Sequence, residues 1–423
     1  MAVPSHASAL LVMMMTISDV LYVYLQRPDN GEWVTVGRYG CDAVSGTGRF
    51  RYAPSYLDAS LPWSIDPVNL PLVRAPIEAT RYGGLHDVLR DACPDSWGQT
   101  LIQREHGLSQ QAHMSMYLLH ASNADRWGAL AVGKSKKPSV SNLMMLKLGQ
   151  LAQLYEELRA MYERRPAVYP NLRRRLAATP SMGGARPKAT VQDQDRYWLV
   201  KPVLPSDVID IPRLEFAVQR WASASGLSFA HTEHDSGDRG LSIVRSLRFD
   251  RHASQRVMCI SAASLLQTTY PGASTDSWSY PALATVLHQI GAPYEDQVEL
   301  FDRMVFNAIV GNDDDHPRNH AIYYCQQSRQ WRLAPAFDVV PNPDYAPVRL
   351  TLQVCYGQNV IERAAVLRDA AAFGFQDQRH AEHHLDQLIE RIQSHAFVAF
   401  ELLPPDLRGL MTERLADGVG RLS

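Results

Sequence analysis

One short stretch of the sequence concentrates side chains that could do chemistry. Residues 310–324 read VGNDDDHPRNHAIYY, in which three consecutive aspartates, two histidines and two asparagines precede an aromatic run. Asp314 lies five positions before Asn319. At this spacing a carboxylate can accept a proton from an attacking hydroxyl group while a carboxamide holds a metal ion. The stretch therefore predicts a phosphoryl-transfer site, which needs further groups elsewhere in the chain.

Two of those further groups have candidates outside the stretch. A metal-binding carboxylate is expected a short hairpin later, and LAPAFDVVPNP places Asp338 directly after a predicted hairpin at residues 320–335. Lys201 in YWLVKPV has apolar neighbours that predict a strand. A buried lysine needs an anionic partner, such as the α and β phosphates of a nucleotide. Glu215, in the helix expected next, is the candidate for orienting this lysine.

A glycine-rich segment, SMGGARPKA, lies shortly before the predicted lysine strand. The backbones of Gly183 and Gly184 can approach a phosphate closely, and Arg186 and Lys188 supply positive charge. Taken alone, Gly-Gly followed by Arg-Pro is an ordinary turn sequence. Its place ahead of the lysine is what makes it a candidate phosphate-binding segment.

Each of these features also has a structural interpretation. Asp313–Asp315 could cap a helix or form a calcium-like site, although no EF-hand spacing is present. Asp338 could simply end a strand, and Lys201 could be a surface lysine with only its aliphatic stem buried. The order and spacing of the features together favour phosphoryl transfer over these separate interpretations.

Two other charged groups are better explained as solvated helix faces. His380, His383 and His384 have a helical spacing that could bind a transition metal, but they lie in a polar helix. Arg173–Arg175 could contact phosphate, but they follow a long helical pattern.

The composition is that of an ordinary folded protein. The chain has 423 residues, a net charge of −2, 46% hydrophobic and 20% charged residues, which suggests two or three packed units and no whole-chain basic field. Its five cysteines are far apart and form no CxxC pair, so we expect neither a disulfide framework nor a zinc knuckle. A cytoplasmic location is therefore expected.

The apolar segment at residues 9–26 is the one stretch that resembles a targeting sequence. It lacks a basic n-region, contains Asp19 and has no cleavage motif, and its apolar part is short for a membrane span. We interpret its end, VLYVYLQ, as a first strand, and we expect translation to begin near Met13–Met15.

The order of the predicted elements indicates an α+β protein. Alternating β-prone runs and turns at residues 18–75 predict a small sheet, and the pattern at 142–165 predicts one long amphipathic helix. A helical segment at 83–107 lies between them, and a strand, a helix and a second strand follow at 196–203, 212–227 and 241–251. Most segments after residue 280 look helical, so a β-containing first half precedes a largely helical second half.

The ordered set of motifs resembles a known family. SMGGARPKA, YWLVKP, SLRFDR, GNDDDHPRNHAIYY and LAPAFDVVP together resemble the HipA family of bacterial serine/threonine kinases, toxins of type II toxin–antitoxin modules. GRFRYAPSYL, SIDPVNLPL and DACPDSWGQTLI are similar to the N-terminal domain of that family, so the resemblance covers most of the chain. NDDDHPRNH is its most specific part.

The resemblance implies a two-lobed, protein-kinase-like α+β fold with a β-rich N-terminal part and a mostly helical C-terminal lobe. It also implies three regions. These are an N-terminal subdomain at residues 1–130, a kinase N-lobe with flap, lysine strand and hinge at 131–250, and a helical C-terminal lobe with the catalytic and metal loops at 251–423.

Carried over by position, the resemblance implies roles for individual residues. Asp314 would be the catalytic base, with His316 close to the transferred phosphate, and Asn319 and Asp338 would hold Mg²⁺. Ser181, in a mobile flap over ATP, would be autophosphorylated, and its phosphate would lie beside Arg186. ATP would contact Lys201, Ser181, Met182, Gly183, Gly184, Lys188, Leu247, Arg248, Phe249 and His316.

Two positions depart from the family pattern. Leu247 stands where some relatives carry an acidic hinge residue, so only main-chain groups of Leu247–Phe249 are expected to meet adenine. Asp315 adds a charge that makes it an alternative base, although the spacing to Asn319 favours Asp314.

The resemblance implies ATP and Mg²⁺ as cofactors. It implies as partners a small helix-turn-helix antitoxin resembling HipB and a protein substrate, which in relatives can be an aminoacyl-tRNA synthetase. Operator DNA would be reached only through the antitoxin, and no membrane contact is expected. Two alternatives remain open: a nucleotide-binding co-repressor with little turnover, and a kinase-fold enzyme that phosphorylates a small-molecule hydroxyl.

Overall fold

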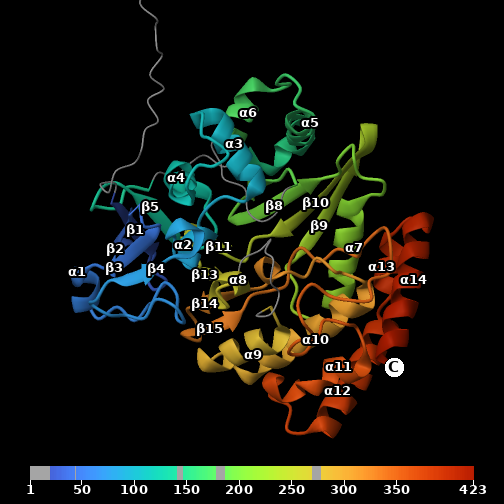
Figure 1. Ribbon diagram of the computed structural model, residues 1–423. Helices are drawn as coiled ribbons and strands as arrows, with labels where there is room; N and C mark the ends of the chain where they lie inside the picture. Colours follow the sequence, from blue (N-terminus) through green and yellow to red (C-terminus); the bar gives the residue numbers. More distant parts are fainter. Residues whose placement is uncertain (1–19, 43, 141–145, 178–185, 269–277) are drawn as a thin grey trace, which may run out of the picture.

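The computed structural model describes residues 20–42, 44–140, 146–177, 186–268 and 278–423 (Figure 1). Three predictions fall outside these residues. They are the translation start near Met13–Met15, the ATP contacts of Ser181, Met182, Gly183 and Gly184, and the autophosphorylation of Ser181.

The predicted N-terminal sheet is present and has five antiparallel strands. In β3, Gly48, Phe50 and Tyr52 are buried while Arg49 and Arg51 are exposed, which is the two-residue period of a strand with one face in the core. The strand order is β4-β3-β2-β1-β5, with β1 (Leu21–Gln26), β2 (Trp33–Asp42), β3 (Thr47–Tyr52), β4 (Ile77–Ala79) and β5 (Leu130–Gly133). The neighbouring helices are α1 (Pro54–Asp58), α2 (Asp87–Asp91), α3 (Ser96–His106) and α4 (Met114–His120).

A second five-stranded sheet carries the predicted lysine strand. Its order is β6-β7-β8-β10-β9, with β6 (Leu146–Lys147), β7 (Ala189–Asp193), β8 (Arg196–Pro202), β9 (Thr232–Gly237) and β10 (Leu241–Leu247). Trp198 and Val200 of β8 are buried in the apolar cluster shared with α5 (Leu151–Tyr162) and α6 (Pro170–Ala177). Because side chains alternate along a strand, Lys201 lies on the opposite face, where α7 (Ile211–Ala224) packs.

The prediction of one long helix at residues 142–165 is wrong in the extent of the helix. The helix there is α5, which begins at Leu151, while Leu146 and Lys147 pair with β7 and Leu148–Gln150 form a 3-10 turn. Strand pairing buries Leu146 in the apolar core of the sheet, and Gly149 weakens a helix in the turn that follows. At residues 146–150, a strand and a 3-10 turn therefore replace the helix that the pattern suggested.

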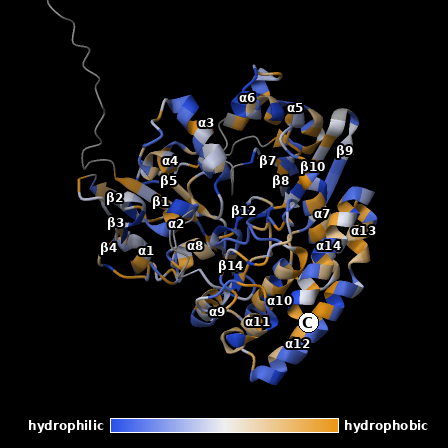
Figure 2. Ribbon diagram, turned by 45° about the vertical axis from the view of Figure 1, so that its right-hand side comes forward, coloured by the Kyte–Doolittle hydropathy of each residue, from blue (hydrophilic) through white to orange (hydrophobic). Residues whose placement is uncertain are grey.

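The second half is largely helical, as predicted, and so the fold is α+β. Its helices are α8 (Ala262–Leu265), α9 (Tyr280–Gln289), α10 (Tyr294–Val310), α11 (Arg363–Arg368), α12 (Gln378–Ser394), α13 (Phe397–Leu402) and α14 (Pro405–Leu422). Figure 2 shows hydrophobic and hydrophilic residues alternating along α12 and α14, which is the pattern of helices with one face in a core. None of the described helices is both long and apolar enough to cross a membrane.

Three short strands lie between the sheets and the helical lobe (Figure 1). β13 (Cys259–Ser261), β14 (Ala321–Cys325) and β15 (Gln330–Leu333) form a sheet in that order, and β14 and β15 are the predicted hairpin. A further hairpin joins β11 (Arg251–His252) to β12 (Gln255–Arg256). The aspartate stretch lies between the end of α10 and the start of β14.

The backbone at Gly311 sets the start of the aspartate stretch. Gly311 caps α10 in the left-handed conformation at φ 73° and donates its N–H to Asn307 O. A side chain there would also collide with Arg414 at 2.9 Å. The helix therefore ends at Val310, and the chain turns into the candidate site.

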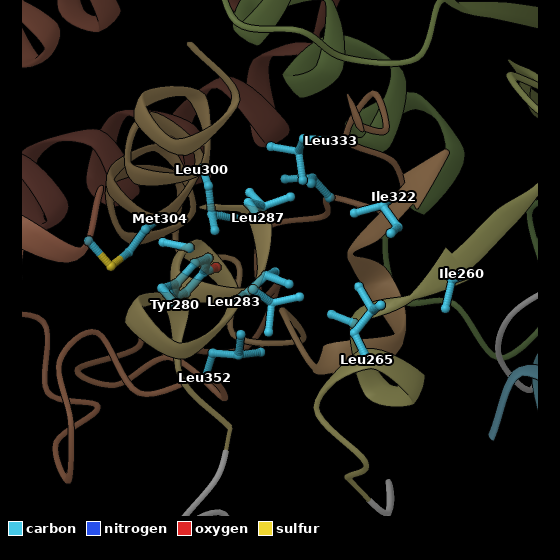
Figure 3. Close-up of a cluster of buried hydrophobic side chains, with 14 of the residues drawn as sticks. Ile260, Leu265, Tyr280, Leu283, Leu287, Leu300, Met304, Ile322, Leu333 and Leu352 are labelled. Carbon is cyan, nitrogen blue, oxygen red and sulfur yellow. The ribbon is translucent and has the colours of Figure 1, made fainter. Parts of the chain in front are cut away.

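The helical lobe is held by a buried apolar cluster. Figure 3 shows Leu283, Leu287 and Leu300, from α9 and α10, close together in this cluster, with Leu333 of β15 nearby. Leu300 is 0% exposed. Since α10 leads directly into the aspartate stretch, this packing also fixes where that stretch begins.

We expect Leu300→Ala to lower the free energy of unfolding by about 2–5 kcal/mol, because the substitution removes buried methyl groups and leaves a cavity. Val208→Ala is the control, since Val208 is 94% exposed and its truncation removes no packing. Urea denaturation followed by circular dichroism measures both variants. Equal stability of the two variants would show that α10 is not anchored as described.

Candidate active site

Lys201 lies at the centre of the candidate site, between two carboxylates. Its Nζ donates hydrogen bonds to Glu215 Oε1 at 2.8 Å and to Asp338 Oδ1 at 2.5 Å. The predicted contact between Lys201 and Glu215 is therefore confirmed, although the two residues are 14 positions apart. Lys201 comes from β8, Glu215 from α7 and Asp338 from the segment after β15, so one ammonium group joins the second sheet to the helical lobe.

The three charges shift one another's pKa values. Burial lowers the pKa of Lys201, but the Asp338 and Glu215 carboxylates outweigh this effect and raise it. Burial raises the pKa of Asp338, but Lys201 and Lys188 more than compensate and bring it down to about 2. For Glu215, burial prevails over the attraction of Lys201, so the pKa is raised. Asp338 is therefore ionised at neutral pH and suited to hold a cation.

The backbone of Asp338 adopts an unusual conformation. Its φ of 59° lies in the left-handed region, which aspartate tolerates better than most residues. Such conformations concentrate at functional sites because the surrounding structure must enforce them. Here a bridge between Phe229 and Ala336 fixes the preceding backbone, and Phe337 packs against Phe249 with ring centroids 5.7 Å apart.

The three consecutive aspartates have different surroundings, beginning with Asp315. The Asp315 carboxylate is buried and accepts hydrogen bonds from Tyr280 Oη at 2.7 Å and from the Thr351 backbone N–H at 2.6 Å. Burial raises the pKa of Asp315 to about 7. Asp315 therefore anchors the stretch to α9 and to the segment around Thr351.

The carboxylates of Asp313 and Asp314 differ in their contacts and in their exposure. Asp313 accepts hydrogen bonds from Asn342 Nδ2 at 3.1 Å and from Tyr345 Oη at 2.9 Å, so it secures the loop that follows Asp338. The side chain of Asp314 is 70% exposed and lines the same cavity as Lys201 and Asp338. This geometry supports the choice of Asp314 over Asp315 as the candidate base.

His316 and Asn319 lie beside Asp314. His316 Nε2 is 3.7 Å from Asp314 Oδ1, and Asn319 Nδ2 donates to the Asp314 backbone oxygen at 2.8 Å. Because the amide nitrogen of Asn319 is used in this bond, its side-chain oxygen is the atom that could bind a cation. Burial lowers the pKa of His316 to about 4, so its ring is neutral at pH 7.

Asn312 is a further candidate cation ligand. It was not assigned to the phosphoryl-transfer site from the sequence. Its Nδ2 donates to Asn307 Oδ1 at 3.0 Å, while its buried Oδ1 has no hydrogen-bond donor among the described residues. An unsatisfied buried oxygen is costly unless a ligand completes it. Asn312 lines one cavity with Asp338 and Asp314 and a second, small one with Asp338 and Asn319. The oxygen set of Asn312, Asn319 and Asp338 therefore fits a hard cation such as Mg²⁺.

Two adjoining cavities meet at the Lys201 cluster. One, of about 100 Å³, has apolar walls that include Leu199, Leu247, Phe249 and Phe337. The other, of about 310 Å³, has charged walls that include Arg186, Lys188, Asp313 and Asp314. Lys201, Glu215 and Asp338 line both cavities. A ligand with a flat apolar part and an anionic part would fit across them.

The predicted hinge contacts are only partly available. The backbone N–H of Leu247 donates to His231 O at 2.8 Å, and that of Arg248 donates to Tyr197 O at 2.8 Å. The guanidinium of Arg248 is held by Asp125 and by Asp250, the latter at 2.8 Å. Phe249 and the backbone carbonyls are therefore the hinge groups left for an adenine ring.

The two basic residues after the glycine pair are each held by an acidic partner. Lys188 Nζ lies 3.4 Å from Asp95 Oδ2, and Arg186 binds both oxygens of Asp207 at 2.8 and 2.5 Å. These partners are 93 and 21 positions away, so no local pattern in the sequence indicates them. Asp95 belongs to the N-terminal region, which thus reaches the charged cavity.

The histidine group of α12 and the arginine group at residues 173–175 each include a residue that contacts another part of the protein. His384 Nε2 lies 2.5 Å from Asp302 Oδ1, and no cluster of three potential metal ligands of the His, Cys, Asp or Glu type occurs in the described ranges. Arg173 pairs with the buried Glu157 and donates to Arg165 O at 2.8 Å.

Comparison with known proteins finds a matching family model for each of two parts of the chain. Residues 180–396 match the model of the HipA-like C-terminal domain, and residues 34–133 match that of the HipA N-terminal domain. A Sinorhizobium fredii protein named "Putative kinase Y4mE" is 30% identical over 146 residues, which are 31% of this chain and 34% of that protein. The alignment thus spans about one third of that relative's length.

A solved structure shares the fold along almost the whole chain. It is the complex of the Shewanella oneidensis MR-1 toxin HipA with HipB and operator DNA. The match has a TM-score of 0.70 and covers 95% of this chain and 96% of that chain, at 15% sequence identity.

We expect the His316 ring to stay neutral in the folded protein until the pH falls to about 4. The pKa is 6.5 for an unperturbed histidine, so the neutral ring's contribution to stability is complete above pH 6.5 and is lost as the pH falls toward 4. Titration of the ring signals by NMR, assigned with His316→Gln, measures this. A midpoint near 6.5 would contradict the buried position described for His316.

Proposed function

This chain belongs to the HipA family, and on that premise we propose that it is an ATP- and Mg²⁺-dependent protein serine/threonine kinase. The observation that carries the proposal is the contact of Lys201 with Glu215 and Asp338, in the same cavity as Asp314. A strand lysine, a carboxylate that orients it, a metal-binding aspartate and a base are the parts that phosphoryl transfer uses.

The two cavities provide for the two ends of ATP. The adenine ring would lie between Leu247, Phe249 and Phe337 in the apolar cavity, and the phosphates would lie beside Lys201 in the charged one. Asn319 and Asp338, with Asn312, would hold Mg²⁺, which when bound neutralises charge on the phosphates.

Asp314 would act on the attacking hydroxyl group. The serine or threonine oxygen of the substrate forms a bond to the γ-phosphorus, the bond from that phosphorus to the β–γ bridging oxygen breaks, and the hydroxyl proton passes to the Asp314 carboxylate. ADP is the leaving group. The neutral ring of His316 can hydrogen-bond near the transferred phosphate without adding a full charge. Positioning and electrostatics supply most of the catalysis in such a reaction.

We extend the proposal to regulation and partners. Autophosphorylation at Ser181 would place a doubly charged group near Arg186, which lies at the charged cavity. A HipB-like helix-turn-helix antitoxin would be the partner through which this chain reaches operator DNA, supported by the complex in which the Shewanella protein was solved. The substrate would be a protein, with an aminoacyl-tRNA synthetase as one candidate.

We expect Asp314→Asn to lower the rate of phosphoryl transfer by about 10²–10⁴-fold, the usual contribution of a general base, while ATP affinity changes little. Asp344→Asn is the matched control, because Asp344 is an exposed carboxylate on the loop that Asp313 secures. Transfer from radiolabelled ATP measures the rate, and calorimetry measures ATP binding.

Loss of ATP binding in Asp314→Asn would make Asp314 a metal ligand and not the base. Undiminished transfer would remove Asp314 from the mechanism. If the unaltered protein binds ATP but transfers no phosphate, the chain is a nucleotide-binding regulator. Consumption of ATP only with a small alcohol would indicate a small-molecule kinase.

We expect radiolabel from γ-labelled ATP to appear on the peptide that contains Ser181, and Ser181→Ala to lose it. Ser206→Ala serves as the control, since Ser206 is an exposed serine close in sequence and should leave the labelling unchanged. Label confined to other peptides, mapped by mass spectrometry, would contradict autophosphorylation in this segment.

A further inference from the structure

The N-terminal sheet carries an open groove that the proposed kinase reaction does not use. Its volume is about 840 Å³, against about 310 and 100 Å³ for the two cavities of the candidate active site. It lies over β1, β2 and β3, and the N-terminal sheet is on the opposite side of the molecule from α12–α14 (Figure 1). A cavity of this size is in the range of sites that enclose a ligand.

The groove has a floor and a wall made by different parts of the chain. Tyr22, Arg38 and Arg51 lie side by side across β1, β2 and β3, because Tyr22 pairs with Arg38 and Arg38 pairs with Arg51. The segment after β5 forms the wall. It is held over the sheet by hydrogen bonds from Tyr24 Oη to Ser135 O and from Thr35 Oγ1 to Lys136 O, the latter of 2.6 Å.

Positive charge collects in this groove without compensation. Arg38, Arg51, Lys136 and Lys137 are all exposed and line it, and none of its described lining residues is an aspartate or glutamate. Arg27 also lines the groove but is neutralised by Asp29, at 2.9 and 2.6 Å. Since the chain as a whole has a net charge of −2, this accumulation is local.

The direct pairing of Arg38 with Arg51 costs stability. Like charges opposite each other on neighbouring strands repel. Within the described part of the chain Arg38 has no ion pair, and the hydrogen bond of Arg51 Nε to Arg74 O, at 3.1 Å, leaves the charge of Arg51 uncompensated. An anion bound over the two guanidinium groups would relieve this repulsion.

Aromatic side chains share the groove with the cations. Tyr22 lies next to Arg38 across the strands, and Trp33 lines the same groove with the Arg256 guanidinium 5.0 Å from its ring centroid. Interleaved cations and aromatic rings suit single-stranded nucleic acid, whose phosphates need charge and whose bases stack on rings. An acidic peptide would use the cations and leave the rings without a partner, and a duplex keeps its bases inside.

We propose that this groove binds single-stranded nucleic acid. The phosphates lie over Arg38, Arg51, Lys136 and Lys137, and a base stacks on Tyr22. The site is separate from the proposed reaction, so a protein that transfers no phosphate would still bind the strand. Contact with an operator duplex through an antitoxin is a different interaction on a different ligand.

The test uses the full chain with fluorescein-labelled oligouridylate and oligothymidylate of about 12 nucleotides, a length within the usual site sizes. Fluorescence anisotropy over a range of salt concentrations gives affinity and salt dependence. We expect Arg38→Ala/Arg51→Ala to weaken binding at least tenfold and to reduce the salt slope by about 1.4, the value for two lost phosphate contacts. Tyr22→Leu should weaken binding about fivefold or more with the slope unchanged.

Arg104→Ala/Arg220→Ala is the matched control, because both arginines are exposed and lie on α3 and α7, outside the groove. It should bind as the unaltered protein does. Circular dichroism verifies that each variant is folded. A preference for either oligonucleotide identifies RNA or DNA as the ligand, and ultraviolet cross-linking to the peptide with Tyr22 would support the proposed base position.

Three results would overturn the proposal. The first is the absence of binding by the unaltered protein, and the second is equal binding by folded Arg38→Ala/Arg51→Ala. The third is competition by polyglutamate at matched charge and salt that is as strong as that of the unlabelled oligonucleotide, which would assign the groove to an acidic polypeptide.

Discussion

The position of the Lys201 ammonium group between Glu215 and Asp338 is the interaction on which the rest of the site depends. One cation with two carboxylates leaves a net negative charge, and removing one partner of a buried ion pair typically costs about 3–5 kcal/mol. The cluster therefore holds β8, α7 and the segment after β15 in one arrangement. It also leaves a carboxylate of low pKa at the cavity where phosphates and a divalent cation would complete the charge balance.

The crowding of three aspartates has a physical explanation in the surroundings of each one. Asp315 is bound by Tyr280 and Thr351, and Asp313 is bound by Asn342 and Tyr345, so both neighbours of Asp314 serve to fix its backbone. Asp314 itself remains exposed at the cavity. Like charges can be adjacent in sequence here because hydrogen bonds from Tyr280, Thr351, Asn342 and Tyr345 stabilise the carboxylates of Asp315 and Asp313.

Much of the site was predictable because spacing along the chain limits where side chains can lie. The interval from Asp314 to Asn319, the hairpin before Asp338 and the strand around Lys201 all follow from local pattern, and the contact with Glu215 follows from the helix after that strand. The acidic partners of Lys188 and Arg186 could not be predicted from local pattern, since Asp95 and Asp207 approach these residues only through tertiary packing. The helix expected at residues 142–165 begins at Leu151 because strand pairing, which no helical period reveals, takes Leu146. The occupied N–H groups of Leu247 and Arg248 likewise depend on neighbouring strands.

The most direct test of this account is a crystal structure of the unaltered chain with Mg²⁺ and a non-hydrolysable ATP analogue. The account predicts the adenine ring between Leu247, Phe249 and Phe337, Lys201 Nζ within hydrogen-bond distance of an α or β phosphate oxygen, and the metal ion bound by Asp338 and Asn319. A nucleotide bound away from Lys201, or a metal ion that contacts neither Asp338 nor Asn319, would contradict it.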